Sequence, residues 1–153
     1  MHTRAAHVAD WLSEHESWLL DVKYSQEFNR TLSELPWTVS GVRWAALDHR
    51  ELEIPEDSPG QGFWEEFHSS PAGSHEFIFL MYGSREPGFV CRTIDAITDL
   101  DLLYSSAPGP RYFCGADLGS SGPIPNFGDF AEYNGDGIIR MYFPPDFTEP
   151  VTP

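Results

Sequence analysis

The segment HEFIFLMY, residues 75–82, constrains the fold more than any other part of the sequence. It is a nearly continuous apolar run bounded by turn residues, as expected for a central strand that is buried on both faces. The turn GSREPG then leads into FVCRTI, residues 89–94, and the two segments together predict a β-hairpin. The chain is therefore expected to contain a sheet with this hairpin in it.

Helical patterns precede the hairpin. Residues 3–22 predict an amphipathic helix that Thr3 can cap, because apolar side chains recur there on one broad face. Residues 25–35 predict a second helix, which Pro36 ends. Helices followed by strands indicate an α+β fold, an antiparallel β-sheet packed by N-terminal helices, and we expect both helices on one face of the sheet.

A length of 153 residues is close to the commonest domain size and allows one core. We therefore predict a single α+β domain over residues 1–146, with the helices at about 3–35 and the sheet-rich part at 37–143. Residues 147–153, rich in proline and threonine, are expected to form a flexible tail.

The remaining segments give weaker predictions. Residues 38–47, TVSGVRWAAL, resemble a strand with Val39 in the core. The acidic, Pro- and Gly-rich residues 51–62 predict an exposed loop, and residues 115–128 predict a second one. FWEEF, residues 63–67, predicts one helical turn with two docked aromatic rings, while residues 95–106 fit either a short helix or an extended edge.

The stretch EYNGDGIIRMYF, residues 132–143, invites three interpretations. As an EF-hand loop it has oxygen ligands at its first, third and fifth positions, but Phe143 stands where a bidentate Glu is needed. A phosphate loop needs a helix after it and usually a lysine, whereas a β-rich run with Arg140 follows here. Asn-Gly suits the positive φ of a hairpin turn, so we favour a four-residue NGDG turn between two strands.

Charge is the strongest global signal. Nine basic residues stand against 24 acidic ones, which gives a formal net charge of −15, and Lys23 is the one lysine. Such a field repels nucleic acid and anionic membranes and accelerates encounter with a basic partner, although acidity also simply aids solubility. Because the acidic residues are spread along the chain, any acidic patch must be assembled by folding.

Cysteine usage and the N-terminus both favour a cytoplasmic protein. Cys91 and Cys114 lie in strand-like segments, and the sequence leaves open whether they are neighbours in space; two buried thiols are the simpler interpretation. The N-terminal residues mix apolar side chains with His, Asp and Glu, and so lack the apolar region of a secretory signal.

No pattern predicts a catalytic, metal or cofactor site. Glu65 and His68 have a Glu-x-x-His spacing, but no second such pair exists for a di-metal centre; a site joining them to His75 or Glu76 would have to be assembled by folding. The Gly-x-Ser-x-Gly motif of serine hydrolases is absent. The carboxylates of residues 95–101 lack a partner that would separate their pKa values.

Aromatic and acidic residues alternate in GQGFWEEFHSS, residues 60–70. Aromatic rings provide contact area and carboxylates steer basic groups, so this pattern is typical of a surface that anchors a protein partner. The predicted partner-binding residues are Glu56, Asp57, Trp64, Glu65 and Glu66, and a core position for Trp64 remains an alternative.

In small size, strong acidity and lack of a catalytic signature, the chain is similar in kind to bacterial immunity proteins of toxin systems, without sharing an alignable motif. That similarity implies a non-enzymatic acidic inhibitor that neutralises a basic toxin, nuclease or other cationic protein. The alternative is a small enzyme or ligand-binding domain with an aromatic-lined pocket between helices and sheet. A structural subunit, the third possibility, would expose a large apolar patch.

Overall fold

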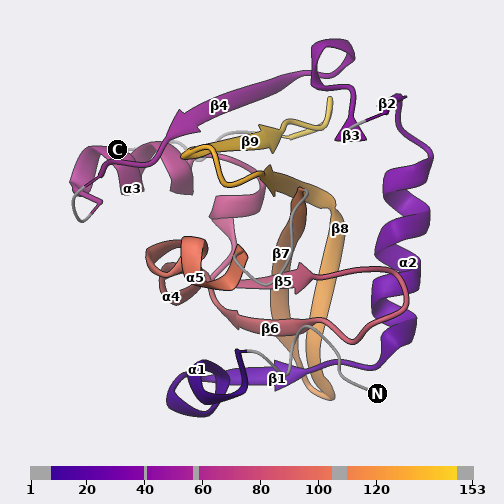
Figure 1. Cartoon of the computed structure of the whole chain (residues 1–153), viewed down its shortest axis with the longest axis vertical. Coiled ribbons are helices and arrows are strands. Elements are labelled where there is room, and N and C mark those ends of the chain that lie inside the picture. The colour runs from indigo at the N-terminus through magenta and orange to yellow at the C-terminus, as the bar shows by residue number, and fades with distance from the viewer. Residues whose placement is uncertain (1–7, 40, 57–58, 105–109, 148–153) are drawn as a thin grey trace.

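A computed structural model describes residues 8–39, 41–56, 59–104 and 110–147. Its centre is a seven-stranded sheet in the order β1-β6-β5-β7-β8-β9-β4, with every neighbouring pair antiparallel (Figure 1). The sheet strands are β1 (Ser17–Leu19), β4 (His49–Glu53), β5 (Phe77–Met81), β6 (Phe89–Arg92), β7 (Arg111–Gly119), β8 (Gly122–Tyr133) and β9 (Ile138–Tyr142). The helices are α1 (Ala9–Glu14), α2 (Val22–Ser33), α3 (Gln61–His68), α4 (Thr93–Thr98) and α5 (Leu100–Tyr104), with 3₁₀ turns η2 (Trp44–Ala46) and η3 (Ala72–Ser74).

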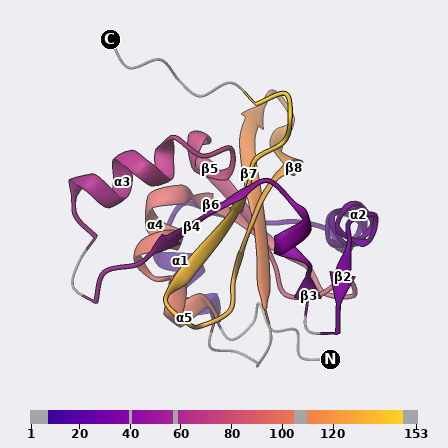
Figure 2. The same cartoon turned by 90° about the horizontal axis from the view of Figure 1, so that it is seen from above.

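Helices cover both faces of the sheet. Figures 1 and 2 show α1, α3, α4 and α5 on one side and α2 on the other. The buried side chains divide in the same way: Trp11, Phe67 and Ile97 belong to one core cluster, and Phe28 and Leu32 to a second. The α+β prediction is confirmed, but the expectation that both N-terminal helices lie on one face is wrong.

The chain changes faces between the two helices because residues 17–19 form β1. The predicted helix over residues 3–22 ends at Glu14, and Trp18 then pairs with Val90 of β6 while its ring packs edge-on against Phe77 at 5.6 Å. Thr3, the predicted cap, lies outside the described residues. The second helix starts earlier than predicted, at Val22, because the Asp21 carboxylate caps it by accepting a hydrogen bond from the Lys23 amide at 2.9 Å.

Strand structure extends into two segments predicted as loops: residues 51–53 complete β4, while residues 54–56, 59 and 60 lie outside helices and strands as predicted. Within residues 51–62, Leu52 is buried in β4 while its neighbours are exposed, so alternation decides the structure despite the acidic composition. Within residues 115–128, β7 and β8 continue as a long hairpin. Pro123 and Pro125 are tolerated because β9 pairs only with residues 131–133, which leaves the outer side of this part of β8 without a strand that needs its N–H groups.

The region after α2 also differs from the prediction. A two-residue hairpin, β2 (Trp37–Thr38) with β3 (Gly41–Val42), replaces the strand expected over residues 38–47, and η2 follows it. Val39 lies at the hairpin tip and is fully exposed, so its predicted core position is wrong. The described part of the ambiguous residues 95–106 lies in two short helices, α4 and α5, which are joined by a turn at Asp99.

Several predictions are confirmed. Segments 75–82 and 89–94 contain the hairpin strands β5 and β6, with Phe79 paired to Val90. The four residues NGDG connect β8 to β9. Their positive φ values occur at Gly135 (77°) and Gly137 (79°) and not at Asn134, so the two glycines provide the turn.

The two cysteines are buried free thiols, and their positions in the sheet do not allow a disulfide between them. Strand β5 runs between the strands that carry Cys91 and Cys114, and the two side chains belong to core clusters on opposite faces of the sheet. Burial raises the pKa of both thiols, so they stay protonated. Across the described ranges no helix is long and apolar enough to span a membrane.

Candidate functional site

Folding separates the charges that the sequence disperses. We define the acidic layer as α1, the described residues of the 54–60 loop (54–56, 59 and 60), α3, and residues 93–104, which contain α4 and α5. These segments contain eight Asp or Glu residues and neither lysine nor arginine. The α2 layer, residues 21–46 on the opposite face, contains three acidic and three basic residues. One face of the molecule therefore carries most of the net charge of −15.

Several carboxylates on or beside the sheet have arginine partners. Arg140 lies 3.2 Å from a carboxylate oxygen of Glu51 and 3.2 Å from one of Asp136. Arg92 contacts Glu16 and Glu76, also at 3.2 Å. Each of these arginines therefore offsets negative charge on or beside the sheet.

Carboxylates of the acidic layer are instead oriented by neutral donors. The Trp11 indole N–H donates to Asp99 at 2.7 Å, and the Tyr133 hydroxyl donates to Asp101. Burial and the Asp101 carboxylate raise the pKa of Tyr133, so the phenol stays protonated and continues to donate. Within the described residues, neither Asp99 nor Asp101 forms an ion pair with a basic side chain. Their positions are fixed while their charge stays uncompensated.

A cleft opens between the 54–60 loop and the helices α4 and α5. Its volume is about 260 Å³. Ile54, Ile97 and Leu100 supply apolar walls, while Glu56 and Asp101 supply carboxylates. No lysine, arginine or histidine lines it within the described chain. The cleft thus joins an apolar interior to two negative charges, which matches the aliphatic stem and charged end of a lysine or arginine side chain.

Four of the five residues predicted from sequence to bind a partner, Glu56, Trp64, Glu65 and Glu66, belong to the acidic layer. Glu56 lines the cleft, and Glu65 and Glu66 are exposed on α3, where Glu65 accepts a hydrogen bond from Gln61 at 2.8 Å. Trp64 is half-buried: its ring stacks on His68 at 5.7 Å and leaves part of its surface outside. Asp57 lies outside the described residues.

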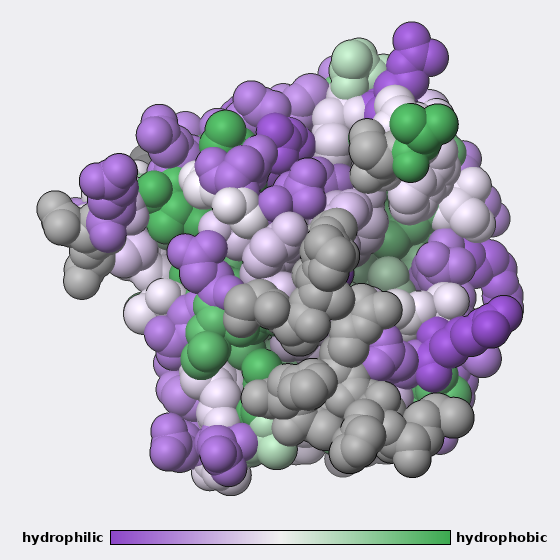
Figure 3. Space-filling view, viewed as in Figure 1, coloured by the Kyte–Doolittle hydropathy of each residue, from purple (hydrophilic) through white to green (hydrophobic). Residues whose placement is uncertain are grey.

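The surface shown in Figure 3 agrees with a charged exterior. Hydrophilic residues predominate along the margin formed by α3 and α1, and hydrophobic residues appear in several separate groups. The large exposed apolar side chains are also dispersed, with Leu19 on β1, Ile94 on α4 and Ile124 on β8 among them. A structural subunit would present a continuous apolar patch, and the described surface has scattered positions instead.

A second cleft lies between α2 and β8 and has a volume of about 350 Å³. Tyr24 and Phe127 give it an aromatic lining, and its charged groups are Lys23 and Glu27. The single cation and single anion do not converge with a histidine or a second carboxylate, as acid–base chemistry would require. This cleft can accept a small apolar group but has no evident reactive centre.

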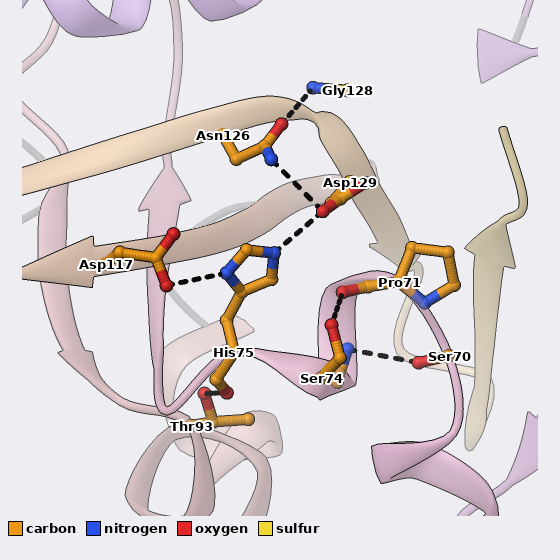
Figure 4. A network of polar contacts seen from close by, with 10 residues as sticks. Ser70, Pro71, Ser74, His75, Thr93, Asp117, Asn126, Gly128 and Asp129 are labelled. Carbon is orange, nitrogen blue, oxygen red and sulfur yellow. Dashed lines mark hydrogen bonds and ion pairs between the residues drawn. The ribbon is translucent and has the colours of Figure 1, made fainter. Parts of the chain in front are cut away.

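His75 is the centre of a polar cluster that the sequence did not predict. In Figure 4 its ring lies between two carboxylates, with Nδ1 at 3.0 Å from Asp117 and Nε2 at 2.7 Å from Asp129. Asn126 also donates to Asp129, at 3.2 Å. These carboxylates are 42 and 54 residues away along the chain, and no local spacing could have identified them.

This arrangement does not suit catalysis, because a general base needs a free ring nitrogen and both nitrogens of His75 are engaged. The predicted alternative, a site joining His68 and His75 with Glu65 or Glu76, does not form: His68 Nδ1 instead contacts the Gly73 carbonyl at 2.8 Å. In the described part of the chain no group of three or more metal-ligating side chains gathers.

Fold and site together define an α+β protein whose most distinctive surface is an acidic, uncompensated helical face. No known family model matches the chain, and a comparison with curated proteins found no match. The assignment of function therefore depends on the physical properties of this surface.

Proposed function

We propose that this protein is a non-enzymatic acidic binding protein that inhibits or sequesters a basic protein partner, as immunity proteins do for toxins. The observation that carries the proposal is the separation of charge: eight carboxylates and no lysine or arginine in the acidic layer, against an electrically balanced α2 layer. A surface of one sign raises the rate at which oppositely charged partners meet it.

The cleft provides a mechanism for specific contact after that encounter. A lysine or arginine side chain of the partner enters between the 54–60 loop and α5, with its stem against Ile54 and Ile97. Its charged end meets Glu56 and Asp101. Because Tyr133 already orients Asp101, little side-chain entropy is lost when the pair forms. Half-buried Trp64 supplies an aromatic contact nearby on the same layer.

Titration with a fluorescein-labelled oligoarginine peptide, followed by fluorescence anisotropy, tests the recognition of basic groups. We expect binding whose association rate falls by about tenfold or more from low to high salt. An oligoglutamate peptide of the same length is the control and should not bind. Binding of oligoarginine that is insensitive to salt, or no binding at all, would contradict the proposal.

Paired variants test where the binding occurs. Glu56→Gln with Asp101→Asn removes both carboxylates of the cleft, whereas Glu27→Gln with Glu34→Gln removes the same charge from the α2 layer. We expect the first pair to weaken oligoarginine binding by about tenfold, because hydrogen bonds to charged groups contribute more than neutral ones. Equal weakening by both pairs would indicate that net charge alone is responsible. A toxin-like gene beside that of this protein would support the inhibitory role, and a metabolic operon would contradict it.

A small ligand-binding domain is the second candidate, and the aromatic-lined cleft between α2 and β8 favours it. Its test is a screen of small aromatic compounds against wild-type protein and a Phe127→Ala variant. Binding that is lost in the variant would support a ligand in this cleft. Unchanged binding in the variant would contradict it.

A further inference from the structure

We propose that His75, Asp117 and Asp129 form a pH-sensitive switch that fixes the base of the β7–β8 arm when His75 is protonated and releases it when His75 loses its proton. We define the arm as residues 115–119 and 122–126, the part of the hairpin beyond the β8 bulge. The proposal is independent of the partner-binding role assigned to the acidic layer.

The cluster lies where the strand pairing is interrupted. Cys114 pairs with Phe130, but the next residue, Gly115, pairs with Asn126, so residues 127–129 of β8 have no partner in β7. Asp129 belongs to this bulge and Asp117 to the opposite strand. His75 bonds to both, and so its ring connects the two strands where backbone hydrogen bonds are missing (Figure 4).

The ring is held in place from two further directions. A Cβ atom at position 115 would lie 2.0 Å from Cδ2 of His75, so glycine there is what allows the ring to approach the strand. The Thr93 hydroxyl donates to the His75 carbonyl at 2.8 Å. With its backbone anchored and its ring packed on Gly115, His75 cannot turn away without disturbing the arm.

Protonation decides whether both bonds can exist. An imidazolium donates from both nitrogens, and each of its N–H groups meets a carboxylate here. A neutral imidazole has one N–H, and its other nitrogen would direct a lone pair at a carboxylate. Asp117 should separate first, since its bond is longer (3.0 Å against 2.7 Å) and its side chain is 66% exposed against 18% for Asp129.

The charges around His75 favour its protonated form, in which both bonds are made. The two carboxylates raise the pKa of His75 above its ordinary value of 6.5, with the Asp129 bond the largest cause, and burial opposes them. The stability that the two His75 bonds give to the arm is therefore fully present below pH 6.5, and it is lost as the pH rises through the higher pKa of His75 in the folded protein. Other ionisable groups on adjoining elements have partners of their own or are buried: Arg92 pairs with Glu76, His68 contacts Gly73, and the Cys114 thiol is protonated.

Release of the bulge has a structural consequence. Phe127 lies in the bulge, two residues before Asp129, and its ring stacks on Phe28 of α2 at 5.5 Å. The same ring lines the cleft between α2 and β8. Loosening residues 127–129 therefore changes the wall of that cleft as well as the arm.

Nuclear magnetic resonance on the full chain tests the switch. We expect the His75 imidazole to titrate above pH 6.5 and the amide signals of residues 115–119 and 122–129 to shift with the same midpoint. In Asp117→Asn, an exposed change that should leave the fold intact, the midpoint should fall towards 6.5. In His75→Gln the pH-dependent shift of the arm should disappear.

His49→Gln is the matched control, because His49 lies on the edge strand β4, away from the His75 cluster, and its Nδ1 contacts the Leu47 carbonyl. It should leave the titration of the arm unchanged. Titration of His75 at or below pH 6.5 would overturn the proposal. Amide signals of the arm whose pH midpoint differs from that of the His75 imidazole would overturn the proposal too. So would an arm midpoint in Asp117→Asn that equals the wild-type value.

Discussion

The acidic layer and the α2 layer cover opposite faces of one sheet and bury similar side chains, yet they differ in their balance of acidic and basic residues. Phe67 in the first and Phe28 in the second are both fully buried. The acidic layer, however, contains no lysine or arginine, while the α2 layer has as many basic as acidic residues. Apolar packing is therefore alike on the two faces, and the difference lies in the solvent-facing residues.

This difference shows that the charge pattern is not needed to build the fold. If an excess of acidic residues were required for packing a helix on this sheet, the α2 layer would also contain more acidic than basic residues. Repulsion among uncompensated carboxylates instead reduces stability slightly, and Asp99 and Asp101 are held in place by neutral donors in spite of it. A surface maintained at a cost in stability is typical of a function at that surface.

Truncation of the two buried phenylalanines gives the largest expected effect. Phe28→Ala and Phe67→Ala should each lower the free energy of unfolding by about 3–5 kcal/mol, because each leaves a cavity under its layer. Urea denaturation measures both. Leu118→Ala is the control and should stay within about 0.5 kcal/mol, since Leu118 is 48% exposed. A loss confined to Phe28→Ala would mean that the acidic layer packs more loosely than α2.

Neutralising exposed carboxylates should have a smaller effect, and one that is confined to the acidic layer. Glu65→Gln with Glu66→Gln should raise the melting temperature by about 1 °C at low salt, because removing two charges relieves part of the repulsion among the carboxylates of the layer, taken as about 0.3 kcal/mol. Glu27→Gln with Glu34→Gln should give no rise, because Lys23 and Arg30 lie on the same helix. Added salt should remove the difference. A rise for both pairs would show that the layers do not differ electrostatically.

The sequence predicted the parts of the fold that depend on local apolar patterns. The apolar run of residues 75–82 contains the buried central strand β5, and the apolar spacing of Phe28 and Leu32 predicted the helix that the structure shows as α2. The failures depended on tertiary context. Residues 17–19 are a strand because β6 is available to pair with them, and the prolines after Gly122 are tolerated because that edge is open.

Prediction of the site was limited for the same physical reason. The acidic loop and α3 could be identified because their charge and aromatic residues are contiguous in sequence. Asp101, the other carboxylate of the cleft, is brought to Glu56 by packing of α5 beside the loop, and no local pattern encodes that contact. His75 with Asp117 and Asp129 requires three separate elements to meet, so it could be found only in the folded protein.

Calcium gives the smallest expected effect, and it concerns the turn between β8 and β9, which belongs to neither layer. The NGDG turn carries Asp136, whose carboxylate already lies 3.2 Å from Arg140 and accepts from the Ile138 amide at 3.3 Å. An ion there would have to displace the arginine and would still lack the bidentate Glu that calcium loops provide. Calcium should therefore leave the melting temperature unchanged, as measured by differential scanning fluorimetry with magnesium as the control. A rise specific to calcium would show that the turn is an ion site, and Asp136→Asn would then abolish that rise.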